Sequence, residues 1–431
     1  MSALARMARQ RGFFVSGSDT AQNARTIALR KEGVPVCIGH DTKALEESDA
    51  VIYTLAITED DPEYRCAVER GLLTVSRADF LGFMTSTYKS RIGVAGSHGK
   101  STVCAMLADI FAAAGRSPTV FCGAEMTGFG SSVLLGEGED CIFEACEYGD
   151  SLLSLSPTTA LVLNLDFDHA DYFADLDALA RSFSLFAKSA PCTVCNAEDA
   201  PLRSALSDTA PLTFGLSHGD CTAEDLRYDG GFGRFTLCAF GERLGEVRLG
   251  VPGEHNVQNA LAAALAATKN GISAEVICTA LSRFAGAERR MRLRGKLRGA
   301  PVFDDYAHHP TEITASIRTA KALGGDRVIA VFQPHTYSRT AALFGDFCTA
   351  LRLAERTFIC DIYPARERDT LGMSAGGLAE AVGPTCSWAG DLAATADALC
   401  HEVREGDTVL LMGAGDIDCI FTHFCAKDFT L

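Results

Sequence analysis

The segment Gly96-Ser97-His98-Gly99-Lys100-Ser101-Thr102 carries the residue types that hold a nucleotide phosphate. Glycines between a strand and a helix leave backbone N–H groups free to bind an anion, and the positive end of the helix strengthens that binding. Lys100 can reach the β- and γ-phosphates, and the Ser101 hydroxyl can bind Mg²⁺. The spacing departs from the usual GxxxxGK[ST], because Val94 stands five residues before Gly99. The segment predicts a phosphate loop, and the alternative is a tight turn with an exposed lysine.

Acidic residues follow two apolar runs that read as strands. Glu144 and Glu147 come at the end of one run, and the segment NLDFDH (residues 164–169) ends the next. In parallel sheets, ligands collect at the carboxyl ends of strands, so both groups could face the phosphate loop. A carboxylate with a histidine can complete a Mg²⁺ or Mn²⁺ site. Helix caps and surface charges are the alternative use of the same residues.

Two further clusters directly follow strand-like runs: DDYAHHP (residues 304–310) and QPHTYSR (residues 333–339). His335 and Arg339 lie four residues apart and would share one face if that segment is helical. Paired histidines after an acidic dipeptide suggest a metal site. No third ligand at a suitable spacing accompanies them, so a structural zinc site is not expected.

Short apolar or β-branched runs alternate with Ala/Leu-rich helical stretches along most of the chain, which predicts an α/β protein with parallel sheets. At about 150 residues per domain, 431 residues indicate roughly three domains. The rhythm of elements places them at residues 1–88, 89–294 and 295–431. Residues 210–250 are rich in Gly, Thr and turn signals, so antiparallel strands are expected there.

The predicted strands are Gly12–Ser16, Ala50–Leu55, Leu72–Ser76, Arg91–Ala95, Cys141–Ala145, Ala160–Asn164, Pro301–Asp304, Arg327–Phe332, Arg356–Cys360 and Thr408–Met412. The predicted helices are Ala21–Glu32, Pro62–Arg70, Ser101–Ala114, Leu176–Lys188, Asn256–Asn270, Glu312–Leu323, Thr340–Ala354 and Leu392–Val403.

Composition excludes several classes of protein. Lys plus Arg is 39 and Asp plus Glu is 55, so the formal net charge of −16 disfavours nucleic-acid binding. Apolar runs are shorter than the ~20 residues of a membrane-spanning helix, so no membrane insertion is expected. Seventeen cysteines are scattered without a CxxC pair, and Met1–Gln10 lacks the apolar core of a secretory leader. We therefore expect reduced thiols in a cytoplasmic protein.

Six segments occur in the order found in Mur ligases: GSHGKST, FEACEYGDSLLSLSPTTALVLNLDFDHADYF, PGEHNVQNALAA, DDYAHHPTEI, FQPHTYSRT and GAGDI. The chain resembles this family from Ser2 to Ile417. DDYAHHPTE and FQPHTYSRT resemble most the branch that adds L-alanine to UDP-N-acetylmuramate. The resemblance implies a Rossmann-like N-terminal domain for the sugar nucleotide, a central P-loop ATPase-type domain, and a Rossmann-like C-terminal domain that closes over the ATP and the amino acid.

The resemblance also implies roles for individual residues. The implied ATP-binding residues are Gly96, Ser97, His98, Gly99, Lys100, Ser101, Thr102, Asn256, Asn259 and Asp305, of which the two asparagines would contact adenine. The implied metal ligands are Ser101, Glu144 and His169, with Glu147 nearby. Lys100, His335 and Arg339 are the implied catalytic residues, and Ser18 and Asp19, in an SGSD turn, would bind the uridine portion.

The implied activity is an ATP-dependent ligase of peptidoglycan precursor synthesis. It would join the lactyl carboxylate of UDP-N-acetylmuramate to L-alanine through an acyl phosphate, with Mg²⁺ or Mn²⁺. A related ligase that attaches a recycled peptide to the same sugar nucleotide, and a P-loop NTPase without ligase activity, are the alternatives. Selectivity for alanine over serine or glycine, and the choice between monomer and homodimer, stay open.

The start of the chain departs from the family pattern. The family's first domain opens with a strand and a glycine-rich turn of the form hFxGIGGxGM, whereas this chain starts at Met1-Ser2-Ala3-Leu4-Ala5 and matches the helix after that turn. We therefore expect an N-terminally truncated first domain, with weak binding of UDP-N-acetylmuramate and unaffected binding of ATP. A functional chain would begin about 10–20 residues upstream, because a strand of about 5–6 residues and its loop must fit there.

Overall fold

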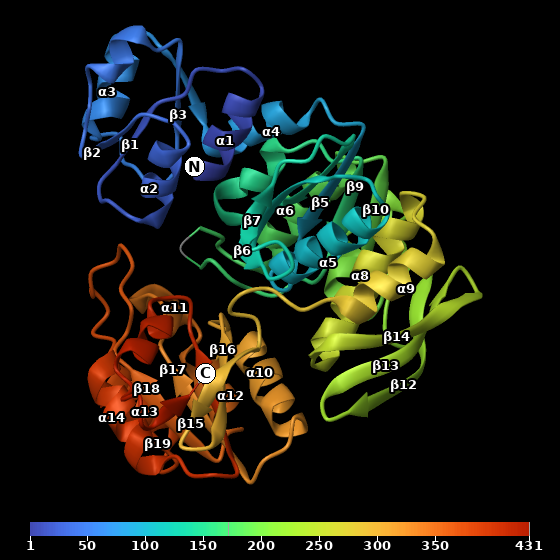
Figure 1. Ribbon diagram of the computed structural model, residues 1–431, viewed down its shortest axis with the longest axis vertical. Helices are drawn as coiled ribbons and strands as arrows, with labels where there is room; N and C mark the ends of the chain where they lie inside the picture. The colour runs from blue at the N-terminus through green and yellow to red at the C-terminus, as the bar shows by residue number, and fades with distance from the viewer. Residues whose placement is uncertain (171, 431) are drawn as a thin grey trace.

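The computed structural model describes residues 1–170 and 172–430, whose strands form four sheets. Figure 1 shows an N-terminal part in blue, a middle part from cyan to yellow, and a C-terminal part in orange and red. The middle part contains a ten-stranded sheet, and the C-terminal part a seven-stranded one. Within the described ranges, every helix is too short or too polar to cross a membrane.

The N-terminal part contains two separate pairs of parallel strands. Its strands are β1 (Gly17–Asp19), β2 (Val36–Ile38), β3 (Ala50–Tyr53) and β4 (Leu73–Ser76), with β1 paired to β2 and β3 to β4. Its helices are α1 (Ser2–Gln10), α2 (Ala24–Lys31), α3 (Pro62–Glu69) and α4 (Arg77–Thr85), with a 3₁₀ turn at Ala44–Glu47. Leu4 and Met7 of α1 and Met84 of α4 are buried with apolar residues of the middle part. These two helices therefore anchor the N-terminal part to its neighbour.

The predicted strand Gly12–Ser16 is wrong. Gly12 lies in a turn with a φ of +88°, directly after α1, and Phe14 is 88% exposed. Strand pairing begins only at Gly17, opposite Val36. The apolar run therefore reflects exposed side chains rather than a buried strand, because no neighbouring strand accepts its backbone hydrogen bonds in the described residues.

The ten-stranded sheet has the order β14-β13-β12-β11-β10-β9-β5-β8-β6-β7. Its strands are β5 (Ser90–Ala95), β6 (Thr119–Met126), β7 (Ser131–Leu134), β8 (Asp140–Glu144), β9 (Thr159–Val162), β10 (Cys192–Asn196), β11 (Leu212–Phe214), β12 (Cys221–Asp229), β13 (Phe232–Ala239) and β14 (Glu242–Pro252). The central strands pair in parallel, and β12, β13 and β14 are antiparallel, as expected for the Gly/Thr-rich region.

Helices of the middle part cover the sheet and form its core. They are α5 (Lys100–Ala113), α6 (Leu176–Lys188), α7 (Ala200–Ala205), α8 (Glu254–Lys269) and α9 (Ala274–Arg283), with 3₁₀ turns at Tyr148–Ser154 and Ser207–Thr209. Small buried alanines along α8 let it pack closely beside α5, whose apolar side chains are almost wholly buried. Because α5 is packed so tightly, its N-terminus fixes the position of the loop that precedes it.

The seven-stranded sheet has the order β19-β18-β17-β20-β16-β15-β21. Its strands are β15 (Arg292–Leu297), β16 (Ala300–Asp305), β17 (Arg327–Phe332), β18 (Arg356–Cys360), β19 (Cys386–Gly390), β20 (Asp407–Met412) and β21 (Phe429–Thr430). Its helices are α10 (Pro310–Ala322), α11 (Tyr337–Ala342), α12 (Phe344–Leu351), α13 (Ala375–Val382) and α14 (Leu392–Glu402), with a 3₁₀ turn at Ile417–Thr422. Two apolar clusters cover the two faces of this sheet.

The predicted helix Thr340–Ala354 is wrong in its bounds. The chain forms two helices, α11 and α12, separated at Leu343, whose φ of −111° and ψ of 19° are not helical. Leu343 packs against the core of the C-terminal part, and this packing overrides the helical propensity of the continuous segment. The break leaves Arg339 in a short helix of its own.

Candidate functional site

The phosphate-loop segment lies between β5 and α5, as the sequence predicts. Gly96 has a φ of +132°, and Gly99 precedes the first turn of α5 with a φ of +84°, a region that residues with a Cβ rarely adopt. A Cβ on Gly99 would lie 2.6 Å from Oδ1 of Asn259, and one on Gly96 would lie 3.0 Å from Leu163. Both glycines are therefore required by backbone conformation and by space.

The ammonium group of Lys100 is held by its own loop and by Glu147. Its Nζ donates to the carbonyl oxygens of Gly96 and Ser97 and lies 2.9 Å from both carboxylate oxygens of Glu147. Burial opposes the charge on Lys100, but the carboxylate of Glu147, with smaller contributions from Cys146 and Glu144, outweighs it, so the pKa of the lysine is raised. Lys100 is therefore a permanently charged group at the start of α5.

Ser101 and Glu144 place oxygen atoms side by side next to this lysine. The Ser101 hydroxyl donates to Oε2 of Glu144 at 2.9 Å, and the same oxygen accepts from the N–H of Gly123 at 2.7 Å. A hydroxyl and a carboxylate are the oxygen donors that Mg²⁺ prefers. These two residues thus suit the predicted metal site.

His169 lies beside Glu147 rather than beside Glu144. Its Nε2 is 3.6 Å from Oε1 of Glu147, whereas no ion pair joins it to Glu144 in the described residues. The backbone of His169 has a φ of +57°, which is costly for a residue with a Cβ and is often found at functional sites. The structure therefore links the predicted ligands as two pairs, Ser101 with Glu144 and Glu147 with His169.

The predicted adenine contacts lie on one face of α8. Asn256 donates from Nδ2 to the carbonyl of Pro252 at 2.7 Å, and Asn259 donates to Oδ1 of Asn256 at 3.2 Å. Both amides are buried, and the side chain of Asn259 directly adjoins Gly99 of the loop. The structure thus brings the asparagine pair to the phosphate loop.

Asp305 ends β16 in the C-terminal part. Its carboxylate accepts a hydrogen bond of 2.6 Å from the Ser316 hydroxyl of α10. Burial raises the pKa of Asp305 to about 7, although the Ser316 hydrogen bond and the charge of Arg290 act in the opposite direction. Near neutral pH this carboxyl group can therefore exist in either protonation state.

Arg339 connects the C-terminal part to the middle part. It makes a buried ion pair of 2.9 Å with Asp168, which follows β9, and its NH1 lies 3.3 Å from Nδ1 of His335. Burial opposes the charge of Asp168, but Arg339, together with His169, His308 and the backbone N–H of His169, outweighs it and lowers the pKa of that carboxyl group. His335 stacks on Tyr363 at 5.5 Å between ring centroids. His335 precedes α11, so the two predicted residues meet without sharing a helix.

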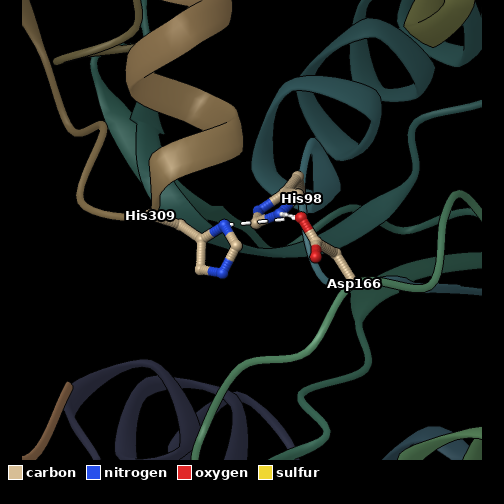
Figure 2. A group of neighbouring side chains, drawn as sticks. All are labelled: His98, Asp166 and His309. Carbon is tan, nitrogen blue, oxygen red and sulfur yellow. Dashed lines mark hydrogen bonds and ion pairs between the residues drawn. The ribbon is translucent and has the colours of Figure 1, made fainter. Parts of the chain in front are cut away.

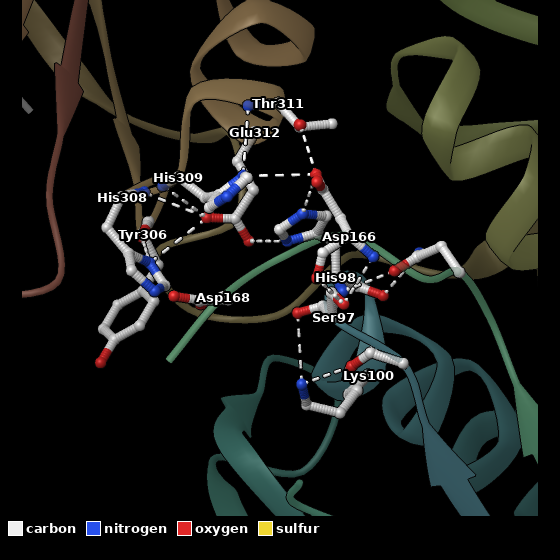
Figure 3. A network of polar contacts seen from close by, with 12 residues as sticks. Ser97, His98, Lys100, Asp166, Asp168, Tyr306, His308, His309, Thr311 and Glu312 are labelled. Carbon is white, nitrogen blue, oxygen red and sulfur yellow. Dashed lines mark hydrogen bonds and ion pairs between the residues drawn. The ribbon is translucent and has the colours of Figure 1, made fainter. Parts of the chain in front are cut away.

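His98 of the loop also reaches the C-terminal part. Figure 3 shows its imidazole between Asp166 of the middle part and Glu312 of α10, with His309 close by. Nε2 of His98 is 2.9 Å from Asp166 and Nδ1 is 3.3 Å from Glu312. Burial opposes the charge of His98, but these two carboxylates outweigh it and raise its pKa to about 9.

Ser18 and Asp19 lie apart from these residues, in β1. The Ser18 hydroxyl donates to Glu63, and Oδ1 of Asp19 accepts from the N–H of Ala21 at 3.2 Å. The predicted SGSD turn is therefore wrong for these two residues, which pair with β2 as a short strand. A cavity of about 610 Å³ opens beside this strand, lined by residues that include Gly17, Arg30 and Asp41.

The sequence pattern gave no individual role to Asp166, Asp168 or Glu312, although the first two stand inside the NLDFDH segment and Glu312 stands beside DDYAHHP, so position after a strand was the available signal. His309 was considered only as one of two paired histidines of a metal site. No comparable feature of the sequence marks Arg289 as a residue of the site. Its guanidinium donates to the carbonyls of Gly413 and Gly415, in the GAGDI segment, at 2.6 and 3.1 Å.

Three family models match the chain. Residues 1–89 match the model described as Mur ligase family, catalytic domain. Residues 94–267 match the Mur ligase middle domain, and residues 289–415 match the Mur ligase, glutamate ligase domain. Together these matches cover most of the chain.

Similar proteins extend over nearly the whole length. UDP-N-acetylmuramate–L-alanine ligase of Lachnospira eligens is 39% identical over 433 residues, which cover 97% of this chain and 94% of that protein. The protein of the same name from Caldicellulosiruptor bescii is 37% identical over 428 residues, with the same coverage of 97% and 94%.

Two solved structures are similar over 98% of this chain and 95% of their own. The crystal structure of UDP-N-acetylmuramate-alanine ligase from Thermotoga maritima has a TM-score of 0.83 and 28% sequence identity. The crystal structure of a murein peptide ligase from Psychrobacter arcticus has a TM-score of 0.71 and 26% identity.

Proposed function

The chain belongs to the Mur ligase family, and from that premise we propose that it joins the lactyl carboxylate of UDP-N-acetylmuramate to the amino group of L-alanine at the expense of ATP. The observation that carries the proposal is the buried contact of Arg339 with Asp168, which brings the C-terminal part to the strand end beside the phosphate loop. A nucleotide-hydrolysing domain alone would not need a second domain docked there.

The reaction needs two steps, because a free carboxylate has no leaving group that an amine could displace. In the first step a carboxylate oxygen attacks the γ-phosphorus of ATP, which forms an acyl phosphate and releases ADP. In the second step the neutral amine of L-alanine attacks the acyl carbon. Phosphate then leaves with the C–O bonding electrons, and the amine loses a proton to give the amide.

Three residues have proposed catalytic roles. Lys100 stabilises the negative charge on the transferring phosphoryl group. A preorganised cation at this position lowers the activation barrier of phosphoryl transfer. Arg339 and His335 stand at the docked face of the C-terminal part, where Arg339 can orient the carboxylate of L-alanine and His335 can contact the reacting groups. Docking of this part also excludes water, which would hydrolyse the acyl phosphate.

A Mg²⁺ ion is part of the proposal. Ser101 and Glu144 would hold it, with His169 as a further ligand and Glu147 nearby, and it would neutralise phosphate charge when bound. The adjacent hydroxyl and carboxylate oxygens support this assignment. Asn256, Asn259 and Asp305 would contact the nucleotide, and the loop residues Gly96–Thr102 its phosphates.

The three parts of the chain would divide the substrates. We assign the UDP portion to residues 1–88, with Ser18 and Asp19, ATP to residues 89–294, and closure over ATP and L-alanine to residues 295–431. All seventeen cysteines are free thiols in the structure, which supports the proposed cytoplasmic location.

Release of ADP measured with and without each substrate tests the proposed function. We expect turnover only when ATP, UDP-N-acetylmuramate and L-alanine are all present. ATP hydrolysis that is insensitive to both other substrates would favour an NTPase without ligase activity. Turnover with a tripeptide but not with L-alanine would favour a ligase for recycled peptides, and serine and glycine tested in turn define the selectivity.

A metal titration of His169→Ala tests the proposed metal ligands. Loss of the imidazole beside Glu147 is expected to raise the Mg²⁺ concentration needed for half-maximal activity more than it raises KM for L-alanine. His218→Ala, at an exposed histidine of the middle part, is the control. A titration curve for His169→Ala that coincides with that of the unaltered chain would remove His169 from the metal site.

A further inference from the structure

The imidazole of His98 is the point where the phosphate loop meets the C-terminal part. Figure 2 shows His98 facing Asp166 and His309, which come from the middle and C-terminal parts. The His98 side chain is only 14% exposed, with Asp166 on one ring nitrogen and Glu312 on the other. One buried ring is therefore held from two domains at once.

The first turn of α10 makes two more contacts across the same boundary. The Thr311 hydroxyl donates to Oδ2 of Asp166, the oxygen that also faces His98. Nε2 of His309 lies 3.1 Å from the carbonyl oxygen of Phe167, as expected for a donating N–H. Asp166 thus accepts hydrogen bonds from both sides of the domain boundary.

These contacts reach the backbone of the loop. The N–H of His98 donates to Oδ1 of Asn164 at 2.8 Å, and the amide of Asn164 donates back to the His98 carbonyl at 3.0 Å. The Ser97 hydroxyl donates to the carbonyl of Asp166 at 2.7 Å. Because loop N–H groups bind phosphate, a shift of His98 or Asp166 displaces the groups that hold ATP.

His98, Asp166 and His309 are also close enough to hold a metal ion, with ligand atoms within 4.8 Å of one another. However, both ring nitrogens of His98 already have carboxylate partners. The ring nitrogens of His309 also have partners: Nε2 contacts the Phe167 carbonyl oxygen, and Nδ1 accepts from the N–H of Thr311. A cation would have to displace these partners, so the hydrogen-bonded arrangement is complete without one.

We propose that Thr311 and Glu312 are positioning residues for ATP: from the C-terminal part they hold Asp166 and His98, and so set the phosphate loop when that part is docked. The inference rests on the proposed function, because it assumes that the loop binds ATP. Neither residue needs to touch a substrate. Docking of the C-terminal part and positioning of the phosphate loop are then coupled.

Three substitutions test the coupling with little change in shape. Thr311→Val removes only the hydroxyl, and Thr311→Ser restores it. Glu312→Gln removes the charge that faces His98 but keeps an oxygen for the N–H groups of His308 and His309, which Glu312 caps. The matched control is Thr349→Val on α12, an exposed threonine whose hydroxyl bonds only within its own helix.

Steady-state ADP release and titration with a non-hydrolysable ATP analogue give the readouts. Thr311→Val and Glu312→Gln are each expected to weaken ATP binding and raise KM for ATP about three- to tenfold, the range of an ordinary hydrogen bond, because each contact reaches ATP only through the loop. KM for L-alanine should stay within about twofold, Thr311→Ser should behave like the unaltered chain, and Thr349→Val should change nothing. Thr311→Val combined with Asp166→Ala should cost less than the two single effects multiplied, because both remove the contact between the Thr311 hydroxyl and Asp166.

Three results would overturn the proposal. One is unchanged ATP affinity in both Thr311→Val and Glu312→Gln. Another is an equal rise of all substrate constants together with a lower melting temperature, which indicates general damage. The third is stoichiometric Zn²⁺ or Mg²⁺ binding that His309→Gln abolishes, which would make the cluster a cation site. If the unaltered chain lacks turnover that depends on L-alanine, the proposed function fails instead, and the analogue titration still decides the coupling.

Discussion

The ammonium group of Lys100 and the carboxylate of Glu147 form a buried pair at the centre of the site, with the lysine 12% and the glutamate 2% exposed. The pair keeps a full positive charge next to loop N–H groups that favour an anion. A phosphate that enters the loop therefore meets a cation already held in place, which is the arrangement that stabilises a phosphoryl-transfer transition state.

Lys100→Ala is expected to lower kcat at least about 100-fold, because removal of one preorganised charge from a transition state typically has that effect. The melting temperature should fall, because the variant leaves the carboxylate of Glu147 buried without its ammonium partner, so kcat is measured at a temperature at which the variant is still folded. Lys89→Ala is the control, since Lys89 is 76% exposed and pairs with Glu139 at the surface. Residual activity above about a tenth of the control value would contradict the assigned role.

The raised pKa of Asp305 makes stability depend on pH. The unfolded chain loses this proton near its ordinary pKa of 3.8, whereas the folded chain keeps it up to about 7. The folded state binds more protons between these values, so its stability falls as pH rises through this window. Asp305→Asn cannot ionise and still accepts the Ser316 hydrogen bond.

The melting temperature of Asp305→Asn minus that of the unaltered chain should therefore increase as pH rises from 5 to 8. Each kcal/mol of difference in the free energy of unfolding corresponds to about 2–4 °C. Thermal unfolding at the two pH values measures the difference. Asp361→Asn, at an exposed carboxylate that accepts from Trp388, is the control. A melting difference that does not vary with pH would show that Asp305 is ionised throughout.

At the scale of elements, the loop and α5 act as one unit. Gly99 is the residue before the first turn of α5, and no side chain caps that end of the helix. The N–H groups of the first turn are therefore available to a ligand. Close contact between Gly99 and Asn259 fixes the distance between this helix end and α8, and so the spacing between the proposed phosphate and adenine contacts.

Gly99→Ala is expected to weaken binding of an ATP analogue more than about tenfold, because the methyl group clashes with Asn259 and the positive φ is strained. Gly115→Ala at the other end of α5 is a matched control: its φ is +72°, but its Cβ would meet nothing within 4 Å. The control should lose stability by about 1 kcal/mol and keep its affinity. Equal affinity losses in both variants would show that strain alone, not contact with Asn259, matters.

At the scale of the whole molecule, a few polar contacts hold the C-terminal part against the middle part. The Arg339–Asp168 pair is buried, with exposures of 12% and 6%. Removing one partner of a buried ion pair leaves an uncompensated charge, whereas removing both leaves a neutral contact. The pair therefore makes docking specific as well as stable.

Asp168→Asn should favour the undocked arrangement, with a larger radius of gyration in solution scattering and faster proteolysis between α9 and β15. The double variant Arg339→Met/Asp168→Asn should lie closer to the unaltered chain than Asp168→Asn does, because no buried charge is left unpaired. Arg243→Met, at an exposed ion pair within the middle part, is the control. A double variant that is more open than Asp168→Asn would contradict this expectation, because the unpaired charge would then not be the cause of opening.

The sequence by itself determined the glycine-rich loop between β5 and α5, the α/β class and most regular elements. Arg327–Phe332 forms β17 as predicted, and Arg91–Ala95 lies in β5, because a short apolar run with β-branched residues between turn signals has few alternatives. The glycines of the loop were equally readable, since their spacing reflects a local backbone requirement. Local rules failed where local and tertiary preferences differ, as at Gly12–Ser16 and at Leu343.

Only the tertiary structure decided which polar groups meet. Arg339 and Asp168 are 171 positions apart in the chain, and Thr311 and Asp166 are 145 apart. Neither helical nor strand periodicity carries information over such distances. The contact of His98 with Glu312 depends on how the middle and C-terminal parts dock. That docking is set by the summed packing and charge of both surfaces, so the short-range pattern around each residue does not contain it.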